Sequence, residues 1–207
     1  MKEIFSDFFK NPDYSNIENK NKFSIQYLQE LLNLIHSKLK VDKQFENDRK
    51  FARTADEIVQ SEICNGCCDF ALVFDKFARE LGIPTVHILS AKTEWIKEMQ
   101  KGKNKGYSGH HFCECYINNK WILVDPANNS IITKYDKNNL KLTMSDKTEY
   151  YVYAKCRDVF EIDDAMQKEL GDNEVGQSKL KMHNKLMKKL FYDFDIDKSK
   201  NINIDVL

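Results

Sequence analysis

The chain has 207 residues, of which 42% are hydrophobic and 31% are charged, a composition that allows one globular domain with a sizeable core and excludes a disordered chain. Its 32 basic residues balance its 32 acidic residues, so no overall charge draws the chain to nucleic acid. The first residues include acids and no long apolar run occurs anywhere, so we expect neither a secretory signal nor a membrane span.

Six cysteines would be enough for a disulfide framework, but their placement argues against one. Cys67 and Cys68 are adjacent, and Cys113 and Cys115 alternate within one predicted strand. Without a secretory signal, reduced thiols are the expected state. We therefore expect a cytoplasmic protein.

The first predicted elements are helical. A short helix is expected within the polar residues 1–22. A second helix is expected to be capped by Ser24, to end near Leu39 and to bury a leucine-rich stripe. Thr54 and Glu57 have the spacing of a capping box, which predicts the start of a third helix.

The stretch CNGCCDFALVFDKFARELGIP, residues 64–84, predicts a helix with a cysteine in its first turn. Apolar residues recur at helical spacing up to Leu81, and Gly82 and Pro84 end the helix. Free backbone N–H groups and the positive end of the helix dipole favour the thiolate of Cys67, which is the nucleophilic form. This helix therefore indicates a candidate nucleophile.

A β-hairpin is predicted downstream, where two strand-like runs flank Asn118 and Asn119. Asparagine tolerates the positive φ angles of a two-residue hairpin turn, and that turn places Phe112 opposite Asp125. Because side chains alternate along a strand, His110 shares the face of Phe112 and is a diagonal neighbour of Asp125, about 7–8 Å away. The register thus allows an aspartate to contact an imidazole.

Further elements complete the expected chain. They are strands at 84–90, 131–132 and 149–156, a short helix near 94–96, and helices at 164–170 and 178–192.

Four motifs occur in an order that resembles the transglutaminase-like superfamily. They are Cys67-x-Asp69-Phe70-Ala71, Leu81-Gly82-Ile83-Pro84, Gly109-His110-x-Phe112-x-Glu114 and Trp121-x-x-Val124-Asp125-Pro126. The resemblance covers about Arg53 to Pro126. It implies an α+β fold with a papain/transglutaminase-like core, in which the catalytic helix packs on an antiparallel sheet. The helices predicted on either side of this core add N- and C-terminal helical extensions to it. The resemblance also implies a triad of nucleophile Cys67, base His110 and orienting acid Asp125.

We expect a single domain over residues 1–207. Within it, residues 1–52 form an N-terminal helical extension, residues 53–156 form the core, and residues 157–207 form a C-terminal helical extension. No internal repeat and no clear linker divides the chain.

The implied activity is acyl transfer from an amide bond through a thioester on Cys67. Water as acceptor gives a protease, amidase or deamidase, and an amine gives a transglutaminase. We expect peptide or protein amide substrates, and no cofactor, nucleic acid or membrane. Gln60 and Asn65 are candidate side-chain donors to the oxyanion, although such residues more often satisfy loop backbone. Glu114 shares the face of His110 and either supports the site or is an exposed strand residue.

Two other hypotheses stay open. A structural zinc site could use Cys64, Cys67, Cys113 and Cys115, because four thiolates are a common zinc ligand set. The last two, however, face away from His110 in the predicted hairpin. The other hypothesis is a non-catalytic binding domain on the same fold, because a fold does not determine a function.

Overall fold

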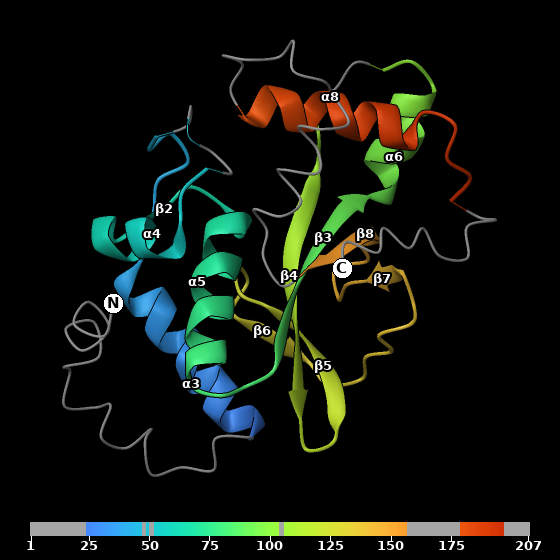
Figure 1. Ribbon diagram of the computed structural model, residues 1–207. Coiled ribbons are helices and arrows are strands. Elements are labelled where there is room, and N and C mark those ends of the chain that lie inside the picture. Colours follow the sequence, from blue (N-terminus) through green and yellow to red (C-terminus); the bar gives the residue numbers. More distant parts are fainter. Residues whose placement is uncertain (1–23, 47–48, 50–51, 104–105, 157–178, 197–207) are drawn as a thin grey trace.

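The structure is a computed structural model that describes residues 24–46, 49, 52–103, 106–156 and 179–196 (Figure 1). It combines helices with an antiparallel sheet, which confirms the predicted α+β class. The helices predicted within 1–22 and at 164–170 lie outside the described residues. In the described part of the chain, no helix has the length and apolar character needed to cross a membrane.

Among the described elements, helices and strands alternate as far as Ile117, and four strands then follow one another before the last helix. The helices are α3 (Ile25–Lys38), α4 (Ala55–Ser61), α5 (Cys67–Glu80), α6 (Thr93–Gln100) and α8 (Lys179–Phe191). The strands are β1 (Lys40–Val41), β2 (Ile63–Cys64), β3 (Thr85–Lys92), β4 (Gly109–Ile117), β5 (Lys120–Asp125), β6 (Ser130–Ile132), β7 (Lys141–Thr143) and β8 (Glu149–Cys156). The main sheet has the order β6-β5-β4-β3-β8-β7, with every neighbouring pair antiparallel.

The predicted helix ends are confirmed. Ser24 caps α3 by accepting a hydrogen bond from the Tyr27 N–H at 3.0 Å. Thr54 and Glu57 form both hydrogen bonds of the capping box at the start of α4. After α5, Gly82 has a φ of 82°, a left-handed conformation that favours glycine and ends the helix.

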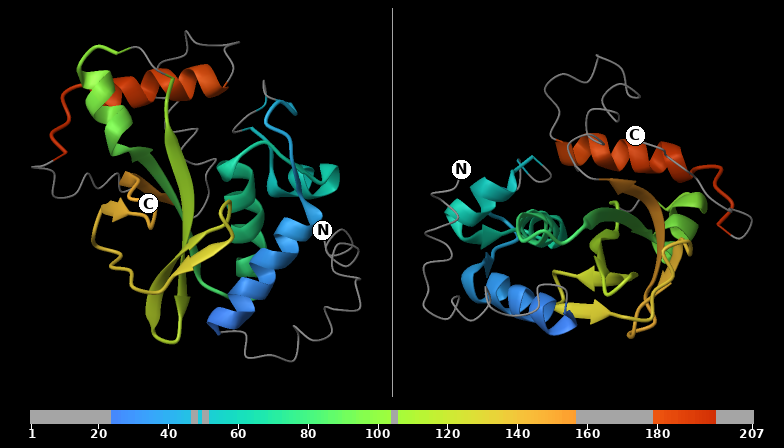
Figure 2. Two further views of the ribbon diagram at one scale, coloured as in Figure 1. Left: turned by 180° about the vertical axis from the view of Figure 1, so that it is seen from behind. Right: turned by 60° about the horizontal axis from the view of Figure 1, so that its bottom comes forward.

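The two faces of the main sheet bury different cores. One face packs on α5, which lies alongside the sheet with α3 beside it (Figure 1). Cys113 and Cys115 are fully buried in this core, as the hairpin register predicts. The sheet curls so that its other face surrounds a smaller core (Figure 2). That core is formed by Ile88, Phe112, Leu123, Leu142, Tyr150 and Val152.

The hairpin between β4 and β5 has the predicted register. Asn118 and Asn119 form its turn with φ angles of 51° and 61°. Ile117 pairs with Lys120 next to this turn. The same register carries on along both strands and brings the start of β4 to the end of β5, where the candidate site lies.

Helix α3 belongs to the larger hydrophobic core although it precedes the predicted core segment. Its buried residues, including Leu28 and Ile35, cluster with residues of α5. The division of the chain into a core and two extensions stays a prediction.

Candidate active site

His110 and Asp125 meet at the end of the hairpin that is remote from its turn. The Nε2 atom of His110 lies 2.7 Å from Oδ1 of Asp125, and their side chains are 12% and 1% exposed. The alternation of side chains along β4 and β5 places both on one face. The structure therefore contains the diagonal contact that the register predicts.

Cys67 is the first residue of α5, the helix that packs on the sheet, and its side chain lies beside His110. It is half-buried, whereas the other five cysteines are buried. A side-chain hydrogen bond joins Cys67 to His110. Because Nε2 contacts Asp125, Nδ1 is the ring nitrogen available to the thiol. The structure thus brings together the three residues of the predicted triad.

The imidazole of His110 is stabilised in its charged form. Burial alone would lower its pKa, but hydrogen bonds with Asp125 and Cys67 and the negative charges of both outweigh burial and raise the pKa from 6.5 to about 10. At neutral pH the ring is therefore protonated. A positive imidazolium beside the thiol favours a thiolate–imidazolium pair.

Asn128 holds the carboxylate of Asp125 in place. Its backbone N–H donates to Oδ1 at 3.2 Å, and its side-chain Nδ2 donates to Oδ2 at 2.8 Å. With the bond from His110, both oxygens of this buried carboxylate are occupied. Sequence reasoning missed Asn128, although asparagine three residues after an aspartate is a common turn signal.

Helix α3 fixes the loop that follows Asp125. Gln29 donates to Oδ1 of Asn129 at 2.8 Å, and Nε2 of His36 donates to the Pro126 carbonyl at 2.7 Å. The His36 ring also stacks on Phe70 of α5, with ring centroids 4.6 Å apart. These contacts connect the helix of the nucleophile with the loop of the acid.

The chain enters β4 through a close contact at Gly109. A Cβ atom at this position would collide with the Tyr107 hydroxyl and the Ser90 carbonyl, so the residue before His110 has to be glycine. The backbone N–H of Tyr107 donates to the side-chain oxygen of Asn184 in α8 at 3.0 Å. Helix α8 is therefore docked on the segment that positions the base.

A buried ion pair between Arg53 and Asp69 supports the loop before the nucleophile. The same guanidinium nitrogen, Nη2, also donates to the Ile63 carbonyl at 3.0 Å. The Asp69 carboxylate accepts the backbone N–H of Asn65 at 2.8 Å. The pair therefore ties the start of α5 to the turn that leads into Cys67.

Arg53→Met should destabilise the protein strongly. It leaves the Asp69 carboxylate buried without its counter-charge, which typically costs about 3–5 kcal/mol of unfolding free energy. Urea unfolding followed by circular dichroism measures this loss. Arg49→Met is the matched control, because Arg49 pairs with Glu57 on the exposed surface, and we expect little change in its midpoint. Equal midpoints for the two variants would contradict the role of the buried pair.

The two side chains predicted to hold an oxyanion are placed differently. Gln60 is exposed on α4. Asn65 is buried, and its Nδ2 donates to the Phe45 carbonyl at 3.1 Å, which is the backbone-satisfying role weighed as its alternative. The backbone N–H of Cys67 lies in the first turn of α5, at the end of the helix that attracts negative charge. Neither Gln60 nor Asn65 is therefore identified as a side-chain donor to the oxyanion.

Glu114 is buried, which contradicts the alternative that it is an exposed strand residue. In the described part of the chain, the Lys155 ammonium and the Tyr135 hydroxyl donate to its Oε1. Glu114 lies four residues further along β4 than His110, and these hydrogen-bond partners are not residues of the triad. Sequence alone could not show that Lys155 compensates this carboxylate, because the two are 41 residues apart.

The other histidines of the sheet lie on the opposite face. Nε2 of His87 is 2.9 Å from Nδ1 of His111, and both rings are buried. Burial and then the charge of Arg79 lower the pKa of His87 to about 3. His87 is thus a hydrogen-bonded core residue rather than a base.

The buried thiols do not gather into a metal site. Burial raises the pKa of Cys64 and Cys113 well above the ordinary range and that of Cys115 to about 12. Over the residues that the structure describes, no three histidine, cysteine, aspartate or glutamate side chains are grouped as a metal site requires. This arrangement contradicts the hypothesis of a four-cysteine zinc site.

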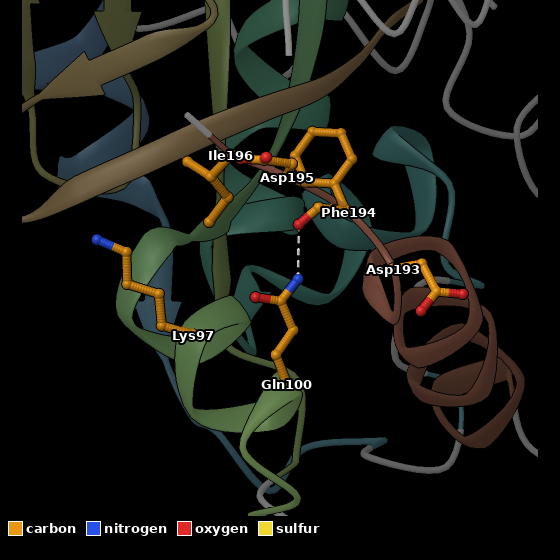
Figure 3. Close-up of a pocket in the computed structure, with 6 residues that line it drawn as sticks. All are labelled: Lys97, Gln100, Asp193, Phe194, Asp195 and Ile196. Atoms are coloured by element: carbon orange, nitrogen blue, oxygen red, sulfur yellow. Dashed lines mark hydrogen bonds between the residues drawn. The ribbon is translucent and has the colours of Figure 1, made fainter. Parts of the chain in front are cut away.

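Two cavities of the described structure lie outside the triad. One, of about 340 Å³, is bounded by α6 and the segment after α8, where Gln100 donates to the Phe194 carbonyl at 2.6 Å (Figure 3). A second, of about 280 Å³, lies at the start of β8. It is lined by Lys92, Thr93, Glu94 and residues 146–149. Neither has a cysteine or histidine in its lining.

Comparison with known proteins gives a family match and a structural match. The family model described as Transglutaminase-like superfamily matches residues 7–126. A crystal structure of a candidate cysteine protease from Cytophaga hutchinsonii matches with 15% sequence identity and a TM-score of 0.48. The match covers 75% of this chain and 44% of that one, so the chain spans less than half of that protein's length. No curated protein sequence matches the chain.

Proposed function

Since the chain belongs to the transglutaminase-like superfamily, we propose that it is a cysteine enzyme that transfers acyl groups from amide bonds through Cys67, His110 and Asp125. One observation carries the proposal. The imidazole of His110 bonds at once to the Asp125 carboxylate, at 2.7 Å, and to the Cys67 thiol. This is the arrangement of nucleophile, base and orienting acid that activates a thiol.

In the proposed reaction the Cys67 thiolate attacks the carbonyl carbon of the amide. A C–S bond forms, and the carbonyl oxygen becomes an oxyanion that the backbone N–H of Cys67 can stabilise. As the oxyanion collapses, the C–N bond breaks and the leaving amine takes the proton of the His110 imidazolium. His110, now neutral, then activates the acceptor that releases the acyl group from the thioester.

The acceptor decides the outcome of this cycle. Water gives hydrolysis, as in a protease, amidase or deamidase, and an amine gives transamidation. We propose a peptide or protein amide as substrate, and every step above uses only side chains and backbone of this chain. The burial of the Asp125 carboxylate against an imidazolium favours catalysis over a binding-only role, because buried charges are costly to stability.

Selective alkylation of Cys67 tests the proposal without knowledge of the substrate. At about pH 6 an ordinary thiol with a pKa of about 8.5 is almost wholly protonated and slow to react. The raised pKa of His110 keeps its ring charged at that pH, so the neighbouring thiolate of Cys67 should persist. Iodoacetamide should therefore modify Cys67 faster than the other five cysteines, as measured by peptide mass spectrometry over time.

The adjacent Cys68 serves as the internal control, because it belongs to the same peptide and is buried. Labelling of all six cysteines at similar rates, or of Cys68 first, would contradict the proposed nucleophile.

A further inference from the structure

Tyr150, the second residue of β8, lies against the base of the proposed triad. Its ring centroid is 5.7 Å from that of His110 and 5.5 Å from that of Phe112. Strand β3 separates β8 from β4, and Ser90 stands between them, paired with His110 on one side and Val152 on the other. Because serine is small and its hydroxyl donates to the His110 carbonyl, the tyrosine ring has room to reach across β3.

The hydroxyl of Tyr150 differs from those of nearby tyrosines. Tyr107 donates to the Ser90 carbonyl at 2.7 Å, and Tyr135 donates to Glu114. No residue in the described ranges hydrogen-bonds the Tyr150 hydroxyl, and this oxygen is not among the buried polar atoms that lack a partner. It is therefore a donor that solvent, or a bound substrate, can reach.

This hydroxyl stays protonated beside the triad. Burial raises the pKa of Tyr150 to about 12, and the charges of Asp125, Asp146 and Cys67 contribute to the rise. Two of those three charges belong to the triad, which agrees with the ring contact to His110. A neutral phenol next to a thiolate can donate a hydrogen bond to charge that develops during attack.

We infer that Tyr150 is a further catalytic residue, whose hydroxyl donates a hydrogen bond to the carbonyl oxygen of the substrate while Cys67 adds to the carbonyl carbon. This inference rests on the proposed function. It supplies the side-chain oxyanion donor for which Gln60 and Asn65 are the sequence-based candidates. The backbone N–H of Cys67 would be the second donor.

The test compares two reactions of the same thiolate in the full chain. With p-nitrophenyl acetate, the Cys67 sulfur forms a bond to the acetyl carbon, the ester C–O bond breaks, and p-nitrophenolate leaves with the electron pair. This acylation passes through an oxyanion. With iodoacetamide, sulfur displaces iodide at a saturated carbon, so that no oxyanion forms.

Tyr150→Phe should therefore lower the rate of acylation and spare the rate of alkylation. Removal of one oxyanion donor typically costs about 10²–10³-fold, so we expect acylation of Cys67 to fall about 100-fold. The alkylation rate should stay within about twofold, because displacement of iodide forms no oxyanion that the hydroxyl could stabilise. Release of p-nitrophenolate and the mass of the Cys67 adduct measure both rates.

Tyr151→Phe is the matched control. Tyr151 is the next residue of β8, points to the opposite face and packs against Phe194. It also loses only a hydroxyl, and both reaction rates should equal those of the unmodified chain.

Three outcomes would overturn the inference. Unchanged acylation in Tyr150→Phe would reduce Tyr150 to a packing residue. An equal fall of both rates would mean that it acts on the Cys67–His110 pair rather than on substrate. If the unmodified chain is alkylated at Cys67 but never acylated there, the proposed function itself fails and this inference with it.

Discussion

His110→Ala should abolish acyl transfer while the protein keeps its fold. His110 is the only partner through which Asp125 can act on Cys67 in the proposed cycle, and loss of a triad base lowers turnover by on the order of 10⁴–10⁶-fold. The selective alkylation of Cys67 near pH 6 should vanish as well, because the imidazolium that favours its thiolate is gone. Release of p-nitrophenolate and alkylation kinetics measure the two losses.

The neighbouring His111→Ala is the matched control for this change. Its ring lies on the opposite face of β4, where it pairs with His87 at 2.9 Å. Removing it leaves a buried polar group without its partner, which costs about 1–3 kcal/mol of unfolding free energy. Activity per folded molecule should nevertheless be unchanged. If His111→Ala lost activity while His110→Ala kept it, His111 rather than His110 would be the base.

The sequence predicts well those features that depend on neighbours in the chain. The stripe of α5 and the positive φ of Gly82 define where the helix ends, so the position of Cys67 at its start follows. The turn at Asn118 and Asn119 defines the register of the hairpin, and this register alone places His110 near Asp125. Both are local patterns whose geometry is determined by helix and strand periodicity.

The contacts that hold these residues in place were not predictable in the same way. His36 bonds to Pro126 across 90 positions of sequence, and Gln29 bonds to Asn129 across 100. Sequence separations this long follow no helix or strand periodicity, so no pattern in the sequence predicts these contacts. The structural role of His36, which bonds to the Pro126 carbonyl and stacks on Phe70, is therefore found from the structure.

Short and distant strands account for the remaining differences. Strand β7 has three residues and strands β1 and β2 have two each, too few to show an alternating pattern. Tyr150 reaches His110 because β8, besides pairing with β7 before it in the chain, also pairs with β3, which is remote in sequence. The order of strands in a sheet is a property of the whole fold, so residues that approach the site across it are found from the structure.

Asp125→Asn should reduce turnover with little change in stability if the aspartate is catalytic. The substitution keeps size and removes charge, but the amide can turn its nitrogen toward His110 and favour the wrong tautomer. In serine proteases the same substitution of the triad aspartate lowers turnover about 10⁴-fold. We expect a smaller loss here, because a preformed thiolate–imidazolium pair depends less on the tautomer.

The same substitution should also lower the pKa of His110. The hydrogen bond that His110 donates to Asp125 is the strongest of the effects that raise this pKa to about 10, and without it the pKa-lowering effect of burial is less opposed. The imidazolium then loses its proton at lower pH, so the thiolate of Cys67 should persist over a narrower range, and alkylation near pH 6 should slow. Titration of the His110 ring by NMR and alkylation rates across pH measure this shift.

Asn128→Ala separates the charge of Asp125 from its placement. Asn128→Ala removes the side-chain donor to Oδ2 and keeps the backbone N–H donor to Oδ1, so the carboxylate is held less firmly while its charge remains. We expect the pKa of His110 to stay raised in this variant and turnover to fall less than in Asp125→Asn. If Asp125→Asn instead unfolds the protein and the folded remainder keeps full reactivity at Cys67, the aspartate is structural. Catalysis would then rest on the pair of Cys67 and His110 alone, with the charge on the imidazole sustained by the thiolate.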